Sequence, residues 1–216
     1  MKQGVIFDMD GLLFDTERVY RECWASLAPE FGQIPDPKLP EAVCGVSGPK
    51  LRQIILEYYP TVDVEAYIQT CTDRVHELLG QEVPEKPGVH EILEYLQETG
   101  VKTAVASSSP VAVIEQNLRL TGIAGYFDAV ISGDQVRRGK PAPDIFLAAA
   151  DLLNLPPSNC YVLEDSIHGI HAAHAAGCAP IMVPDMTAPN DEMHRICTGI
   201  YSSLIEVMEA MKQETL

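Results

Sequence analysis

The sequence predicts an α/β fold, a parallel sheet with helices on both faces and an inserted helical domain. Three observations support this prediction: apolar runs alternate with helical patterns after residue 87, another apolar run covers residues 4–7, and residues 16–82 show helical patterns alone. Strands that alternate with helices of this length form parallel sheets with right-handed crossovers. We therefore expect a core domain of residues 1–15 and 83–216 and a helical cap domain of residues 16–82.

The first predicted strand ends in the most informative motif of the chain. Its apolar residues 4–7 are followed by Asp8, Met9, Asp10 and Gly11. Both acids would lie at the carboxyl edge of the sheet, where open α/β folds bind ligands, and the glycine allows a sharp turn. Carboxylates there can bind a hard cation, attack an electrophile or transfer a proton. The same motif also occurs in calcium loops and in ordinary turns.

Apolar residues at three- and four-residue spacing predict three helices in the inserted segment. The first follows Thr16 and ends near Gly32, where prolines 35, 37 and 40 interrupt the pattern. Two more are expected at residues 50–59 and 64–79, with Pro49 in a first turn and Pro60 ending a helix. An insertion at this point of the chain would lie over the carboxyl edge of the sheet, so we expect it to act as a lid.

Polar residues follow three further apolar strands of the core. The expected helices are residues 89–96, 111–120, 144–153, 167–176 and 204–211, and the expected strands are residues 102–106, 129–131, 161–163 and 181–183. Ser107 follows the first of these strands, Lys140 precedes Pro141, and Glu164 and Asp165 follow a strongly apolar strand. Alone, Ser107 is typical of a turn or a helix cap and Lys140 of a solvated loop, whereas the carboxylate pair is harder to explain in this way. Together they are what an aspartyl phosphate mechanism requires, since paired acids at a sheet edge repel each other unless a cation offsets them.

These residues form four motifs in the order of a known superfamily. The motifs are DMDGLLFDTE at residues 8–17, Ser107, GKPAPD at residues 139–144 and EDS at residues 164–166. With them the chain resembles the haloacid dehalogenase superfamily over essentially its whole length. It looks most like the β-phosphoglucomutase-like phosphatases, which carry a small helical cap between the first and second motifs. The resemblance implies a Rossmann-like core, Mg²⁺ as cofactor and a small phosphorylated metabolite as substrate.

The resemblance also implies a role for each matching residue. Asp8 would be the nucleophile that becomes phosphorylated, and Asp10 would protonate the leaving oxygen and then activate water. The expected ligands of the phosphoryl group are Ser107, Ser108, Gly11 and Lys140, and those of Mg²⁺ are Asp8, the Asp10 carbonyl, Asp165 and Glu164, the last directly or through water. Elementary electrostatics agrees with these roles. A carboxylate attacks a phosphate ester only when cations, here Mg²⁺ and Lys140, screen the two negative charges.

The cap sequence departs from the mutase pattern of this superfamily. Residues 44–48 have Cys44 and Gly48 where mutases place a lysine and an arginine, and Tyr20 replaces a mutase histidine. A mutase holds a bisphosphate by both ends, and Lys50 or Arg52 would have to replace the lost arginine. We therefore expect an Mg²⁺-dependent phosphatase acting on a sugar phosphate or nucleotide-like metabolite. A phosphosugar mutase and a catalytically silent phospho-ligand-binding protein are the alternatives.

Composition limits the partners and the compartment. The formal net charge of −16 over 216 residues disfavours nucleic acid and anionic membranes. The first strand begins within a few residues of Met1, no apolar run approaches membrane-spanning length, and six cysteines at irregular spacing resemble reduced thiols. We expect a cytoplasmic protein without disulfides, either a monomer or a weak homo-oligomer.

Two clusters of basic residues are expected to lie on the surface and to have no part in catalysis. His168, His171 and His174 share one side of a predicted helix whose other side is small and apolar, so we expect them to face water and to bind no metal. Arg137 and Arg138 are expected to be solvated, although their closeness to Lys140 would allow them to attract anions.

Overall fold

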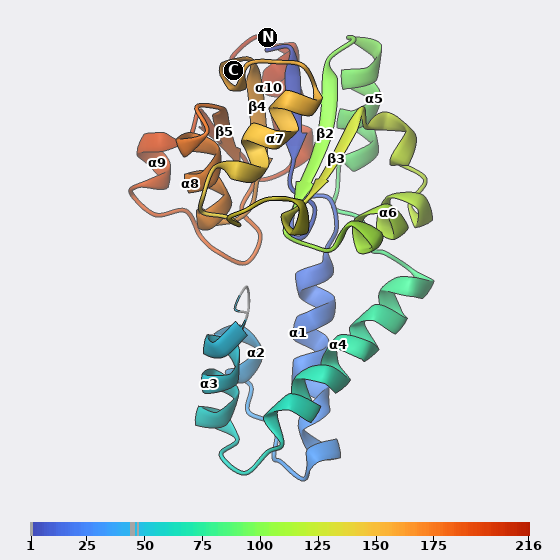
Figure 1. Ribbon diagram of the computed structural model, residues 1–216, viewed down its shortest axis with the longest axis vertical. Helices are drawn as coiled ribbons and strands as arrows, with labels where there is room; N and C mark the ends of the chain where they lie inside the picture. The colour runs from blue at the N-terminus through green and yellow to red at the C-terminus, as the bar shows by residue number, and fades with distance from the viewer. Residues whose placement is uncertain (1, 44–45, 47) are drawn as a thin grey trace. The chain divides into compact units, whose positions relative to one another are not determined.

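Six parallel strands form the sheet of the computed structural model, which describes residues 2–43, 46 and 48–216 (Figure 1). In spatial order they are β3 (Ala129–Ser132), β2 (Lys102–Ser107), β1 (Gly4–Phe7), β4 (Cys160–Glu164), β5 (Ala179–Met182) and β6 (Gly199–Ile200). Neighbouring strands are parallel throughout. The predicted parallel α/β sheet is confirmed.

Helices cover both faces of this sheet. They are α5 (Val89–Glu98), α6 (Val111–Leu120), α7 (Asp144–Leu152), α8 (Ile167–Ala175), α9 (Met193–Ile196) and α10 (Leu204–Lys212), with short 3₁₀ turns η2 (Ala124–Tyr126), η3 (Gly133–Gln135) and η4 (Pro157–Asn159). Figure 1 shows α7 in front of the strands and α10 behind them. Ile6, Ala104 and Val162 pack with α7 and α8 in one buried cluster. The alternate residues Val5 and Val105 are also fully buried, as expected for a sheet covered on both faces.

The strand registers bring the predicted motif residues to one edge of the sheet. Phe7 pairs with Val105 on one side and with Leu163 on the other. The residues that follow, Asp8 after β1 and Glu164 at the end of β4, therefore lie side by side. The backbone N–H of Asp8 continues the sheet by donating to the Leu163 carbonyl at 3.0 Å.

The inserted helices make a second unit with its own core. The chain divides into a core unit, Met1–Phe14 with Glu85–Leu216, and a helical unit, Asp15–Pro84. The helical unit contains α1 (Thr16–Leu27), η1 (Ala28–Phe31), α2 (Leu39–Ala42), α3 (Gly48–Tyr58) and α4 (Val64–Gln81). Its core is built around Tyr67, whose ring centroid lies 5.7 Å from Trp24, 5.0 Å from Phe31 and 5.8 Å from Tyr59. These aromatic contacts give the unit an interior of its own.

Several short elements were not expected from the sequence. β6 has two residues and α2 and α9 have four each. Cys23, Cys71, Cys160, Cys178 and Cys197 are free thiols, whereas Cys44 lies outside the described residues. Among the helices of the described residues, none combines the length and the apolar character that crossing a membrane requires.

Candidate active site

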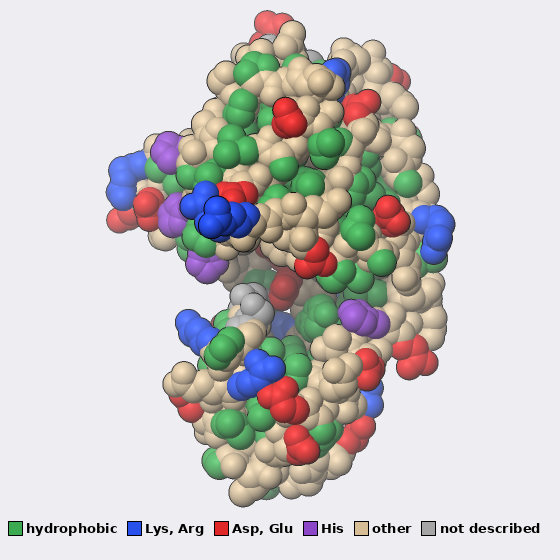
Figure 2. Space-filling model, in the orientation of Figure 1, with side chains coloured by type: hydrophobic (Ala, Val, Ile, Leu, Met, Phe, Trp, Pro, Cys, Tyr) green, Lys and Arg blue, Asp and Glu red, His purple; other side chains and the backbone are tan. Residues whose placement is uncertain are grey.

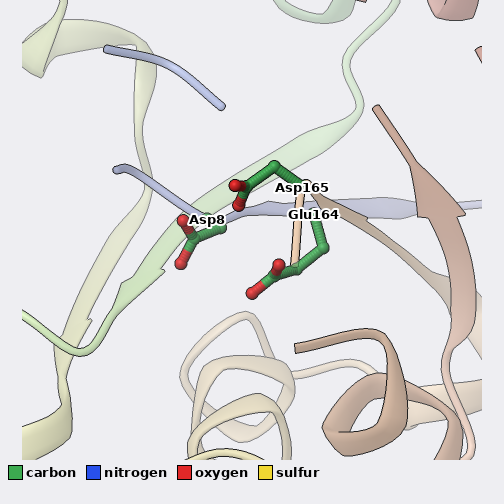
Figure 3. Close-up of side chains that lie close together, drawn as sticks. All are labelled: Asp8, Glu164 and Asp165. Atoms are coloured by element: carbon green, nitrogen blue, oxygen red, sulfur yellow. The ribbon is translucent and has the colours of Figure 1, made fainter. Parts of the chain in front are cut away.

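Three carboxylates meet where β1 and β4 end. Asp8, Glu164 and Asp165 each offer an oxygen within 4.8 Å of the others, and Figure 3 shows the three side chains close together. Asp8 and Glu164 are 7% and 1% exposed, and Asp165 is half-buried. Hard divalent cations prefer such oxygen ligands, so the donor set fits Mg²⁺.

Burial changes the acidity of two of these groups. Loss of hydration, followed by repulsion from Glu164 and Asp8, raises the pKa of Asp165 to about 9. For Asp8, burial is also the largest effect and outweighs the attraction of Lys140, so its pKa rises to about 8. A cation bound among the carboxylates would favour their ionised forms and reverse both shifts.

Lys140 supplies the positive charge of the site. Its ammonium donates to Asp8 Oδ1 in a very short contact, to Glu164 Oε1 at 2.7 Å and to the Ala106 carbonyl at 3.2 Å. It also lies 5.0 Å from the ring centroid of Phe146. Burial alone would lower the pKa of Lys140, but Asp8 and Glu164 outweigh it and raise that pKa above its usual range. Lys140 thus stays charged while only 8% of its side chain is exposed.

Glu164 is fixed by the start of α8. Its Oε2 accepts hydrogen bonds from the backbone N–H and the hydroxyl of Ser166, both at 2.8 Å. Gly169 makes room for this carboxylate, because a Cβ atom there would lie 1.7 Å from Glu164 Oε1. The helix therefore holds Glu164 in one place and requires a residue without a side chain beside it.

Gly11 shapes the turn after Asp10. Its φ of +86° is in the left-handed region, and a Cβ atom would lie 2.5 Å from Asp165 Oδ2. Its N–H donates to the Phe14 carbonyl at 2.8 Å. The backbone conformation and the lack of room for a side chain explain why position 11 is a glycine. Its expected role as a phosphate ligand stays a prediction.

Asp10 lies against the serine turn that follows β2. Its Oδ2 accepts from Ser109 Oγ at 2.8 Å and from Ser107 Oγ at 3.2 Å. Ser107 is buried, whereas Ser108 is exposed. Sequence reasoning chose Ser107 and Ser108 and missed Ser109. The available signal was the run of three serines, which does not say which hydroxyl turns inward.

Sequence reasoning also missed an ion pair whose acid acts on the carboxylates. Lys86 Nζ lies 2.6 Å from Asp185 Oδ1, with 22% and 11% of the two side chains exposed. The charge of Asp185 is one of the influences that raise the pKa of Asp165. Neither Lys86 nor Asp185, which follows β5, belongs to a sequence motif. Nothing in the sequence therefore indicated that the two residues form a pair.

The three histidines of α8 face solvent or contact an acidic side chain. Figure 2 shows His, Lys and Arg side chains gathered over α8 and α9. His168 and His174 are exposed, and His171 Nε2 lies 3.3 Å from Glu192 Oε2. Among the described residues, Asp8, Glu164 and Asp165 are the one group of potential metal ligands.

The paired arginines differ from each other. Arg138 donates to both oxygens of Asp144, at 3.2 and 2.7 Å. Arg137 is exposed. The structure thus commits Arg138 to an ion pair and leaves Arg137 on the surface.

The fold and the site define a hydrolase of one family. The family model of haloacid dehalogenase-like hydrolases matches residues 5–183. Similar proteins include a phosphorylated carbohydrates phosphatase of Thermotoga maritima, 35% identical over 179 residues and covering 81% of this chain and 82% of that protein. A fructose-1-phosphate phosphatase of Escherichia coli is 35% identical over 175 residues and covers 81% and 92%.

Solved structures give the same result. A HAD family hydrolase from Deinococcus radiodurans, solved with bound phosphate and sodium, has a TM-score of 0.83 at 25% identity and covers 98% of this chain and 96% of that one. A β-phosphoglucomutase from Clostridium difficile has a TM-score of 0.74 at 27% identity and covers 99% and 96%. This chain belongs to the haloacid dehalogenase-like hydrolase family, which confirms the resemblance.

Proposed function

We propose that this protein is an Mg²⁺-dependent phosphatase that hydrolyses small phosphomonoesters through phosphorylation of Asp8. The observation that carries the proposal is the contact of Asp8 with Lys140 beside Glu164 and Asp165. This arrangement combines a carboxylate nucleophile, a fixed ammonium and oxygen donors for a cation. Phosphoryl transfer depends mainly on such positioning and charge compensation.

The proposed reaction has two steps. Asp8 attacks phosphorus, the ester P–O bond breaks, and the departing oxygen takes a proton from Asp10. Water then attacks the phosphorus of the aspartyl phosphate, Asp10 accepts a proton from that water, and phosphate leaves Asp8. Asp8, Glu164, Asp165 and the Asp10 carbonyl are the proposed Mg²⁺ ligands. When bound, the ion supplies positive charge that lowers the repulsion between carboxylate and phosphate.

Phosphate contacts complete the proposal. The phosphoryl oxygens bind Lys140, the hydroxyls of Ser107 and Ser108, and the turn at Gly11. Each of the three hydrogens of Lys140 already has an acceptor in the structure, so an incoming phosphate takes the place of one of them. Lys140 keeps its charge throughout, and its contact with Asp8 aligns the attacking carboxylate.

A sugar phosphate is the proposed substrate class. The relatives named for phosphorylated carbohydrates and fructose 1-phosphate support this choice. The helical unit would select the leaving group, as its resemblance to a cap domain implies. We favour hydrolysis over a mutase reaction, in which the phosphoryl group moves to another position of the sugar. A mutase would need Arg52 to replace the missing arginine, but Arg52 binds both oxygens of Glu65 in its own unit, at 2.5 and 3.1 Å. The loop compared with mutases contains residues 44, 45 and 47, which lie outside the described residues.

One single-turnover experiment tests the phosphorylated aspartate. Asp10→Asn is mixed with p-nitrophenyl phosphate and Mg²⁺, quenched in acid within one turnover, reduced with borohydride, digested and analysed by mass spectrometry. This ester loses its leaving group without a proton, and the variant lacks the base for the second step, so the phosphoenzyme should accumulate. We expect Asp8 to be converted to homoserine, because borohydride reduces an acyl phosphate and leaves a free carboxylate unchanged. Release of one equivalent of p-nitrophenol with Asp8 left unmodified would contradict the proposal.

Steady-state assays separate the alternatives. Release of p-nitrophenol from p-nitrophenyl phosphate should require Mg²⁺, disappear in Asp8→Asn and persist in Asp151→Asn, a change at an exposed residue of α7. Conversion of β-glucose 1-phosphate to glucose 6-phosphate with added bisphosphate would favour the mutase. Absence of metal-dependent release from a panel of sugar phosphates and nucleotides would favour a binding protein.

A further inference from the structure

The serine turn at the end of β2, residues 107–109, binds the carboxylate of Asp10 through two hydroxyl groups. Ser109 Oγ donates to Asp10 Oδ2 at 2.8 Å, and the more distant Ser107 Oγ lies 3.2 Å from the same oxygen. Both serines are 97 or more residues away from Asp10 in the sequence. The contact is therefore a product of the β1–β2 pairing, and it involves a residue to which the proposed reaction assigns no role.

Ser109 is held on both sides of its own backbone. Its N–H donates to Ser107 Oγ at 3.0 Å, and its carbonyl accepts from Ser132 Oγ at 2.7 Å. Ser132 is fully buried and pairs in register with Ser107 across β2 and β3. A Cβ atom on Gly133 would lie 3.2 Å from Ser108 Cα, so the next turn packs closely on this one. The backbone that carries the Ser109 hydroxyl is therefore held in place by hydrogen bonds on both sides.

We propose that Ser109 is a positioning residue that fixes the rotation of the Asp10 carboxyl group and determines which of its oxygens exchanges the proton. The proposal rests on the function proposed above. A hydroxyl that donates to Oδ2 makes this oxygen an acceptor, so the acidic proton of Asp10 resides on Oδ1. Rotation of the carboxyl group about Cβ–Cγ would break the 2.8 Å contact. Ser109 thus presents Oδ1 to the ester oxygen at one angle.

The reaction that uses this geometry is the departure of a poor leaving group. As the P–O bond of an alkyl phosphate breaks, the ester oxygen must receive the proton of Asp10 Oδ1. A p-nitrophenolate ion is stable enough to leave without that proton. Positioned acids and bases contribute about 10²- to 10⁴-fold to such steps. Misalignment of Asp10 should therefore slow alkyl esters far more than p-nitrophenyl phosphate.

Two esters of similar size test the inference. We would compare kcat/KM for benzyl phosphate and p-nitrophenyl phosphate in wild type, Ser109→Ala and Ser109→Thr. This parameter ends with departure of the first leaving group, so the later hydrolysis of the phosphoenzyme does not enter it. In Ser109→Ala we expect about a tenfold or larger loss for benzyl phosphate and less than about threefold for p-nitrophenyl phosphate. Ser109→Thr keeps the hydroxyl and should restore most of the loss.

Other outcomes overturn the inference. Equal losses for the two esters would mean that Ser109 binds phosphate or maintains the turn, and unchanged values would mean that its contact with Asp10 has no effect. Ser109→Cys, of similar volume but a weaker donor, decides the question by the same ratio if the alanine variant does not fold. Failure of the wild type to hydrolyse either ester would instead contradict the proposed function itself.

Discussion

At the scale of single residues, the site balances three acids against one ammonium group. Asp8 and Glu164 share Lys140, whereas Asp165 has no such contact with Lys140 among the hydrogen bonds that the structure describes. The cost of burying a charge is recovered only through good pairing. Lys140 is consequently as important for holding the acids together as for the chemistry.

Replacement of Lys140 by methionine should expose this structural role. In the absence of metal, loss of the ammonium leaves buried carboxylates unpaired, and breaking such a pair costs about 3–5 kcal/mol. We expect urea unfolding in EDTA to show a loss of this size, and added Mg²⁺ to recover more stability than in wild type. Lys212→Met, which removes an exposed pair with Glu209, should change stability by less than about 1 kcal/mol. Equal stability of the two variants would contradict this account of Lys140.

Gly169 gives a second prediction at this scale. Glycine to alanine inside a helix ordinarily stabilises by about 0.5–1 kcal/mol. At Gly169 the new Cβ atom would lie 1.7 Å from Glu164 Oε1, so Glu164 must move. We expect Gly169→Ala to raise the Mg²⁺ concentration for half-maximal hydrolysis of p-nitrophenyl phosphate by about tenfold, as changes around metal ligands commonly do. His168→Ala, on an exposed position of the same helix, should leave it unchanged, and unchanged Mg²⁺ dependence in the glycine variant would disprove the coupling.

At the scale of elements, the strands that carry the site are the ones the sequence predicts best. β1 and β4 are uninterrupted apolar runs that stop at acids, so both their place and their polar ends could be recognised. β6 could not, because two residues have no periodicity and Gly199–Ile200 becomes a strand only by pairing with β5.

Individual contacts within the site were less predictable than its residues. Asp8 and Glu164 could be identified as neighbours because they follow parallel strands, and Lys140 could be added because it belongs to a motif of the family. The contact between Ser109 and Asp10 depends on how one turn closes against η3, which is a tertiary effect. Sequence patterns report burial and period, and they contain no record of which oxygen a given hydroxyl approaches.

The helical unit should depend on its aromatic cluster. Tyr67 of α4 is fully buried against three rings, and its hydroxyl donates to the Trp24 carbonyl at 3.4 Å. Truncation of a large buried aromatic residue costs about 3–5 kcal/mol. We expect Tyr67→Ala to accelerate amide hydrogen exchange in α1 and α4 strongly, whereas Leu78→Ala, at a position of α4 that is 47% exposed, should not. Protection in α1 that survives the tyrosine change would refute this role for the cluster.

At the scale of the whole molecule, a net charge of −16 is combined with buried acids that resist ionisation. Repulsion among many negative charges already opposes the compact state as pH rises. The divalent cation proposed for the three site carboxylates would remove part of that repulsion, at groups that are shielded from water. The metal should therefore act on global stability as well as on turnover.

The pH dependence of this effect follows from the shifted pKa values. Asp8 and Asp165 ordinarily titrate near 3.8 and, in the metal-free fold, burial raises these pKa values to about 8 and about 9. Between about pH 4 and about pH 9 the native state therefore binds more protons than the unfolded chain. The free energy of unfolding falls as the pH rises through this range. Glu30, Glu65 and Asp144 have lowered pKa values and act only in more acidic solution, where their ion pairs are lost.

In the proposed site Mg²⁺ would bind the ionised carboxylates and release their protons, so it should reverse this trend. We expect urea unfolding in EDTA to give decreasing stability from about pH 5 to about pH 9, and the extra stability given by a fixed Mg²⁺ concentration to grow over the same range. Asp165→Asn removes one of the two titrations, so its EDTA series should be less steep than that of the wild type. An Mg²⁺ effect of equal size at every pH would mean that the ion does not replace protons on Asp8 and Asp165, and that the cation site lies elsewhere in the chain.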